Sequence, residues 1–91
     1  MTALHTEEYR RFAAALAEAR RAVGLSQYDL ADRLGVSQDF ISKYEGGRRR
    51  LDVIEFLRVV RAMGVEPEVV LGPLKANPGS FRRPTSGREP R

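Results

Sequence analysis

The sequence predicts an all-α domain of five short helices, followed by a flexible basic tail. One segment carries apolar residues at helical spacing, and four later segments begin with a helix-capping signal. No stretch of useful length alternates between polar and apolar residues, as a half-buried strand would. A chain of 91 residues is long enough for one small domain. We expect this domain to cover residues 1–72 and the tail, rich in proline and glycine, to cover residues 73–91.

The first helix is expected over about residues 7–23. Phe12, Leu16, Ala19 and Val23 recur at intervals of four, three and four residues, which places them on one side of a helix. The alanines and arginines between them also favour helix. Gly24 follows directly, and glycine commonly ends a helix because it adopts the left-handed conformation without strain.

Each of the four later helices is expected to begin with a capping side chain that has an apolar residue on either side. The expected caps are Ser26, Ser37 and Asp52, and Glu55 completes a capping box with Asp52. A weaker cap at Glu66 precedes a proline at the first helical position. The apolar pairs that would close as hydrophobic staples are Leu25 with Leu30, Val36 with Ile41, Leu51 with Phe56, and Val65 with Val70. The expected helices span residues 27–34, 38–45, 53–63 and 67–71.

The connection between the second and third helices is very short. Only Gly35 and Val36 lie between the end of one helix and the cap of the next, so the chain must turn sharply. Gly35 can adopt the positive φ that such a turn needs. Ala31 is small enough for the two helices to approach closely, and Ile41 is apolar and expected to point inward. Residues of these types at these intervals meet the packing requirements of a DNA-binding helix-turn-helix, here over about residues 27–45.

Residues 25–71 read LSQYDLADRLGVSQDFISKYEGGRRRLDVIEFLRVVRAMGVEPEVVL. This segment resembles the helix-turn-helix family of Cro and the phage repressors, also called the XRE-like family. The shared pattern, SQ…LA..LGVSQ..IS..E.G.R, is long and free of gaps. The resemblance implies a compact lambda-repressor-like domain of five helices that binds a pseudo-palindromic operator in double-stranded DNA as a homodimer. It also implies a bacterial or phage-encoded protein. The sequence has no long apolar run and no signal-peptide pattern, so a soluble protein of the cytoplasm is expected.

The third helix would be the recognition helix of this family, with one face in the major groove. Its polar side chains occupy positions i, i+1, i+4 and i+5, which form one face. The predicted base contacts are Gln38, Asp39, Ser42 and Lys43. Gln38 can pair with adenine through two hydrogen bonds, and Lys43 can donate to guanine. Asp39 could accept from cytosine or could simply complement the helix dipole, and both roles stay open.

Phosphate contacts are expected from residues at the helix ends. The resemblance assigns Gln27, at the start of the second helix, to a position that holds a phosphate. Arg48, Arg49 and Arg50 follow the recognition helix in a loop with two glycines, where they would meet the sugar-phosphate backbone. A run of charges is more often only a solvated surface. Its position directly after this helix favours the phosphate role.

The net charge of +4 does not by itself indicate DNA binding, because it lies in the predicted tail. Residues 73–91 carry five basic residues and one acidic residue, whereas residues 1–72 carry eleven of each. Within the domain, residues 20–50 hold seven basic and four acidic residues, so positive charge gathers near the predicted recognition helix. DNA binding is therefore indicated by the helix-turn-helix and not by the overall charge.

Two further sets of residues are expected to have structural roles. Arg20 and Glu45 each lie four residues after an inward-facing apolar side chain. They are therefore predicted to meet in a salt bridge, which the resemblance also supports. Val69, Val70 and Leu71, on the short fifth helix, are predicted either to contact a second subunit or to close the core.

The favoured function is a sequence-specific transcriptional regulator, a repressor that occupies a promoter. The alternative is an antitoxin-like interaction protein of the same fold, whose tail or core binds a partner protein and whose DNA binding is secondary or autoregulatory. An enzyme is not supported, because the sequence has no nucleophile–base pair, no phosphate-binding glycine motif and no metal-ligand cluster. No cofactor, metal, membrane or small-molecule ligand is expected.

Overall fold

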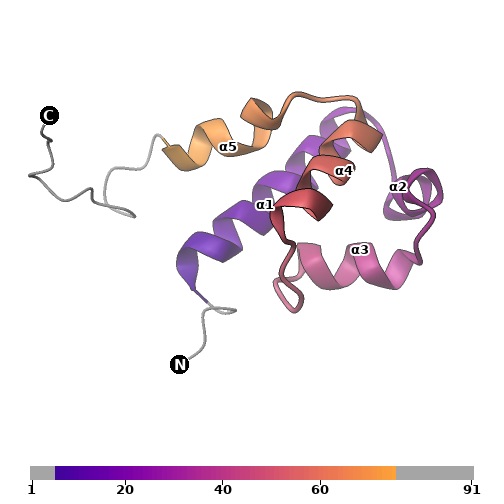
Figure 1. Ribbon diagram of the computed structural model, residues 1–91, viewed down its shortest axis with the longest axis horizontal. Coiled ribbons are helices and arrows are strands. Elements are labelled where there is room, and N and C mark those ends of the chain that lie inside the picture. Colours follow the sequence, from indigo (N-terminus) through magenta and orange to yellow (C-terminus); the bar gives the residue numbers. More distant parts are fainter. Residues whose placement is uncertain (1–5, 76–91) are drawn as a thin grey trace, which may run out of the picture.

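The computed structural model describes residues 6–75, which form five α-helices and no strand (Figure 1). The helices are α1 (Glu7–Ala22), α2 (Gln27–Leu34), α3 (Gln38–Glu45), α4 (Val53–Met63) and α5 (Pro67–Lys75). The predicted all-α class and the five predicted helices are confirmed. Residues 76–91, which make up most of the predicted tail, lie outside the described residues, as do residues 1–5. None of the described helices is long and apolar enough to cross a lipid bilayer.

The last helix is longer than predicted. We expected it to end at Leu71, but α5 continues through Gly72 and Pro73 to Lys75. Pro73 has no backbone N–H, so α5 forms one helical hydrogen bond fewer at this position. Leu74 is half-buried, so the added turn also packs apolar surface. The helix thus crosses the boundary that was expected after residue 72.

Side-chain caps begin the central helices as predicted. Ser26, Ser37 and Asp52 each accept a hydrogen bond from the backbone N–H three residues later, at 2.9, 3.2 and 2.7 Å. Glu55 completes the predicted capping box by accepting from the backbone N–H of Asp52 at 2.9 Å. A second box was not predicted: Asp29 accepts from the backbone N–H of Ser26, and its hydrogen bonds to Ser26 hold its pKa below the usual range. These caps fix where α2, α3 and α4 begin.

Gly35 makes the turn between α2 and α3 with a φ of +72°. No heavy atom lies within 4 Å of the place that a Cβ would take, so only the backbone conformation disfavours a larger residue. We therefore expect Gly35→Ala to lower the free energy of unfolding by about 1–2 kcal/mol, as measured by urea denaturation. The matched control is Gly72→Ala in α5, where a Cβ also meets no atom and φ is not positive. Equal losses at the two glycines would contradict this explanation.

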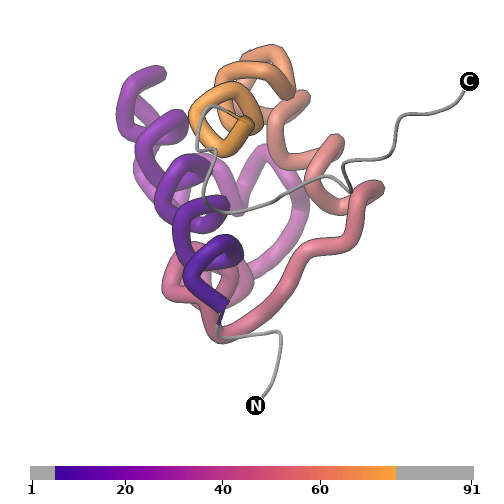
Figure 2. Tube along the Cα trace, turned by 90° about the vertical axis from the view of Figure 1, so that its left-hand side faces the viewer, coloured from indigo at the N-terminus to yellow at the C-terminus, as the bar shows by residue number. Residues whose placement is uncertain are grey.

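All five helices contribute to the core. Leu30, Ile41 and Tyr44, from α2 and α3, have no exposed surface. Helix α1 packs against α3 and α5, and α2 packs against α3 and α4. The two views agree that α5 lies beside α1 (Figures 1 and 2). Helix α3 lies along one edge of the domain (Figure 1), and its buried residues are Ile41 and Tyr44.

The three apolar residues predicted as subunit contacts in α5 differ in exposure. Val70 is fully buried in the core, so its side chain is not available to a second subunit, and the core-closing alternative holds for it. Val69 is 52% exposed, and Leu71 is partly buried at the edge of the core. Because side chains of successive helical residues point in different directions, the three could not share one role.

Candidate nucleic-acid interface

The residues predicted to contact bases lie on α3, on the side that faces away from the core. Asp39 and Lys43 are exposed, and Gln38 and Ser42 are half-buried at the border of this face. Ile41, on the opposite side, has no exposed surface. The structure therefore divides α3 into an inner and an outer face as the spacing predicted, and the base contacts themselves stay a prediction.

The two charged residues of the outer face pair with each other. Lys43 Nζ lies 3.2 Å from Asp39 Oδ2, and both side chains are largely exposed. An exposed pair at this helical spacing contributes only about 0.3–0.5 kcal/mol. Lys43 can therefore leave Asp39 for a base or a phosphate at little cost. Asp39 thus has a partner on its own helix, in addition to the two roles left open above.

Four polar side chains form a continuous series from the inside of the domain to the outer face of α3. Arg20 donates from Nε to Glu45 Oε2 at 2.8 Å and from Nη2 to Glu45 Oε1 at 3.1 Å. Gln27 donates from Nε2 to the same Glu45 Oε1 at 2.9 Å. Gln38 donates from Nε2 to Gln27 Oε1 at 2.7 Å. We call these four residues the Arg20–Gln38 network.

The predicted salt bridge between Arg20 and Glu45 is present and buried, with side-chain exposures of 9% and 6%. Arg20 also donates from Nη1 to the carbonyl of Leu25 at 2.8 Å, so each guanidinium nitrogen has a partner. The hydrogen bond to the Glu45 carboxylate raises the pKa of Arg20. Since Arg20 lies in α1 and Glu45 ends α3, the bridge fixes the predicted recognition helix to the body of the domain.

Among the three loop arginines, Arg49 is already engaged within the protein. Its Nη1 and Nη2 lie 3.2 and 3.0 Å from the two carboxylate oxygens of Glu55. Its guanidinium also lies 4.6 Å from the centroid of the Phe40 ring. The hydrogen bond to Arg49 is the main cause that lowers the pKa of Glu55. Arg49 therefore braces the loop against α4, and a phosphate would have to compete with Glu55 for it.

The other two loop arginines are exposed. The guanidinium of Arg50 lies 4.6 Å from the centroid of the Tyr9 ring. Arg48 forms no ion pair within residues 6–75. The Tyr9 hydroxyl ties this loop to α1, because it donates to the carbonyl of Arg49 and accepts from the N–H of Leu51, each at 3.0 Å. The loop is thus held from two sides while Arg48 stays at the surface.

Two residues that hold the loop of this surface were not predicted to do so. Tyr9 holds the loop by its hydroxyl, and Glu55 binds Arg49 in addition to its predicted capping role. No spacing rule connects such positions, because their partners lie across a loop or in another helix. Tyr28 is 71% exposed in the first turn of α2. It lies directly after Gln27, and no role was predicted for it.

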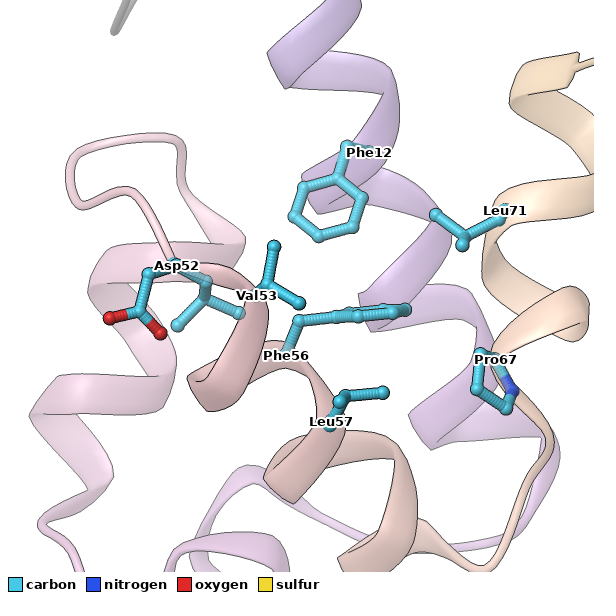
Figure 3. A pocket seen from close by; sticks show the side chains of 8 residues that line it. Phe12, Asp52, Val53, Phe56, Leu57, Pro67 and Leu71 are labelled. Atoms are coloured by element: carbon cyan, nitrogen blue, oxygen red, sulfur yellow. The ribbon is translucent and has the colours of Figure 1, made fainter.

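A separate feature is an apolar groove of about 330 Å³ between α1, α4 and α5. Figure 3 shows Phe12, Phe56 and Leu71 pointing into it from these three helices. The two phenylalanine ring centroids are 5.4 Å apart, and among residues 6–75 Asp52 is the one charged side chain in the lining. None of the predicted DNA contacts lines this groove. Within residues 6–75, no group of three or more His, Cys, Asp or Glu side chains could hold a metal ion.

Comparison with known proteins points to the class that the geometry indicates. Residues 16–70 match a family model described as helix-turn-helix. The chain is 36% identical over 66 residues to the uncharacterised HTH-type transcriptional regulator y4dJ of Sinorhizobium fredii. That match covers 72% of this chain and 86% of the relative.

Two solved structures share the fold. An XRE-family like protein from Pseudomonas syringae is 46% identical, with a TM-score of 0.72 over 79% of this chain and 88% of that one. The restriction-modification controller protein C.AhdI from Aeromonas hydrophila is 29% identical, with a TM-score of 0.66 over 71% of this chain and 98% of that one. The family is a non-enzymatic class, in agreement with the prediction that the chain is not an enzyme. With its short α2–α3 turn, its outward polar face on α3 and these matches, the chain belongs to the XRE-type helix-turn-helix family of DNA-binding transcriptional regulators.

Proposed function

We propose that this protein is a transcriptional repressor that binds a pseudo-palindromic operator as a homodimer, with α3 in the major groove. The observation that carries the proposal is the outer face of α3, where the Arg20–Gln38 network holds Gln38 in the first turn. In helix-turn-helix proteins, the N-terminal residues of the second helix contact base edges. The matched relatives are bacterial, and bacterial DNA lies in the cytoplasm, so the proposed location is the cytoplasm.

The proposed contacts follow from exposure and from existing partners. The proposed base contacts are Gln38, Asp39, Ser42 and Lys43. The proposed phosphate contacts are Arg48, Arg50 and Gln27, which would use the amide hydrogen that it does not donate to Glu45. Arg49 is proposed to reach a phosphate only when it leaves Glu55, and otherwise to position the loop. Contacts from side chains at helix ends and in flanking loops set the register of a protein on DNA without reading its sequence.

The experiment compares binding to the DNA upstream of the protein's own gene with binding to scrambled DNA, over a range of salt concentrations. A regulator should prefer the upstream DNA strongly. Gln38→Ala should shrink this preference, because it removes a base contact. Arg48→Ala should instead weaken both DNAs alike and reduce the salt slope by about one. Equal affinity of the unaltered protein for the two DNAs would contradict the proposed function.

The proposed homodimer places a second copy of the chain on the apolar groove. Val53 and Val69 are 69% and 52% exposed, and Leu71 lines the groove between α1, α4 and α5. A second copy that covers these side chains would remove apolar surface from water, which favours association. A dimer on a palindrome should place its two α3 helices roughly 34 Å apart. Light scattering with and without operator DNA measures the stoichiometry, and one copy per operator would contradict the dimer.

The alternative function is an antitoxin-like module, and the same groove favours it, because a partner protein could cover the exposed apolar surface in place of a second copy. DNA binding would then be secondary or autoregulatory. A chain that ends after Lys75 keeps all described helices and tests whether DNA binding depends on the domain or on residues 76–91. If this shortened chain loses all DNA binding while the full chain binds both DNAs equally, the repressor proposal is wrong.

A further inference from the structure

In a step that rests on the DNA-binding function proposed above, we propose that Glu45 is a positioning residue for base recognition. Acting through Gln27, it fixes the direction in which the Gln38 amide faces DNA, and so it sets the preference of Gln38 for adenine over guanine. This role is additional to the salt bridge with Arg20, which fixes α3 to the domain. It gives the buried carboxylate an effect on which base pair is chosen.

The hydrogen-bond direction in the network is fixed at its buried end. A guanidinium can only donate and an ionised carboxylate can only accept. Both oxygens of Glu45 accept from Arg20, and Oε1 also accepts from Gln27 at 2.9 Å. The Gln27 amide must therefore turn its nitrogen toward Glu45. Because the side chain of Glu45 is only 6% exposed, water has little access with which to replace this contact.

The direction of the Gln27 amide in turn determines how Gln38 can donate to it. With its nitrogen held by Glu45, Gln27 presents its oxygen to α3, where it accepts from Gln38 Nε2 at 2.7 Å. One amide hydrogen of Gln38 is thus donated within the protein and is not available to DNA. Its oxygen and its second amide hydrogen have no hydrogen-bond partner within residues 6–75. One acceptor and one donor remain side by side at the start of the recognition helix.

This remaining pair matches adenine. The major-groove edge of adenine offers a donor at N6 and an acceptor at N7, whereas guanine offers acceptors at both O6 and N7. If Gln27 were reversed, its nitrogen would face Gln38, and the Gln38 oxygen would be used to accept from it. Two amide hydrogens of Gln38 would then be left for DNA, a pattern that suits guanine. The direction that Glu45 imposes therefore decides which purine Gln38 accepts.

Two variants test this in the full chain. In Glu45→Gln the new amide can donate or accept, so the direction of the Gln27 amide is no longer fixed. Gln27→Met removes the connecting amide but leaves the Arg20–Glu45 bridge. Gln38→Ala first identifies the base pair that Gln38 contacts, and operators with A·T or G·C at that pair are then compared. We expect each variant to reduce the adenine preference by about tenfold, since a two-bond contact discriminates by roughly that factor or more.

The matched control is Ile41→Val, which lowers stability from a fully buried position on α3 without touching the network. It should keep the adenine preference of the unaltered protein. If Glu45→Gln does not fold, Arg20→Met combined with Glu45→Leu takes its place, because it removes the same carboxylate without leaving a buried charge. An unchanged preference in the folded variants, even with weaker binding overall, would overturn the positioning role and leave the proposed function standing. A protein that prefers no DNA sequence before any substitution would overturn both.

Discussion

Replacing Arg20 by methionine is expected to lower the free energy of unfolding by about 3–5 kcal/mol. Methionine keeps much of the apolar stem but removes every donor, so the carboxylate of Glu45 would stay buried with only Gln27 beside it. A buried charge without its partner is strongly destabilising, because neither water nor a cation compensates for its desolvation. Urea denaturation of the variant and the unaltered protein measures the loss.

Two controls separate the buried pair from a general effect of removing an arginine. Arg21→Met removes the neighbouring arginine, whose pair with Glu18 is exposed, and should change stability little. Arg20→Met combined with Glu45→Leu removes both buried charges and should regain most of the loss, because apolar pairs often replace buried ion pairs without cost. If the losses from the two single changes simply add, Arg20 and Glu45 are not coupled as the structure indicates.

The expected size of this loss explains why base preference, and not affinity, is the informative measurement for Glu45. A variant that loosens α3 weakens every complex, because the whole recognition helix is then less well ordered. Only the ratio between two operators cancels this common loss. The Arg20–Glu45 bridge and the Gln27–Gln38 contact therefore have separable effects, one on the amount of folded helix and one on the hydrogen-bond pattern that the helix presents.

Local chemistry was predictable from the sequence because its interactions span few residues. The caps at Ser26, Ser37 and Asp52 each join a side chain to a backbone N–H three positions later, and Gly35 meets a conformational need of its own position. The end of α5 was not predictable in this way. Pro73 normally indicates a break, but the packing of α5 on α1 outweighs that tendency.

The environments of the loop arginines could not be predicted, because a run of three identical residues does not indicate which side chain points toward the domain and which toward the surface. Gly47, with a φ of +78°, redirects the chain so that Arg49 meets Glu55 while Arg48 stays exposed. The Arg20–Glu45 pair was predictable because both residues follow inward-facing apolar positions. The participation of Gln27 in the same network was not, since it depends on how α2 packs against α3.

The two buried tyrosines are expected to respond oppositely to the loss of their hydroxyl groups. Tyr44 is fully buried, and its hydroxyl has no hydrogen-bond partner within residues 6–75. Tyr9 is buried as well, but its hydroxyl donates to the carbonyl of Arg49 and accepts from the N–H of Leu51. Burial raises the pKa of both phenols, so both remain neutral hydroxyl groups at physiological pH. The difference between them is therefore one of hydrogen bonding.

Tyr44→Phe should raise the free energy of unfolding by about 1–3 kcal/mol, because it removes a buried polar group without a partner and keeps the ring that packs on Phe40. Tyr9→Phe should lower it by a similar amount, since two backbone groups of the loop lose their partner. Urea denaturation of the two variants, measured side by side, gives the comparison. A loss of stability in Tyr44→Phe would mean that its hydroxyl is satisfied in solution. Because Tyr44 lies on the inner face of α3, the stabilised variant should keep the DNA preference of the unaltered protein.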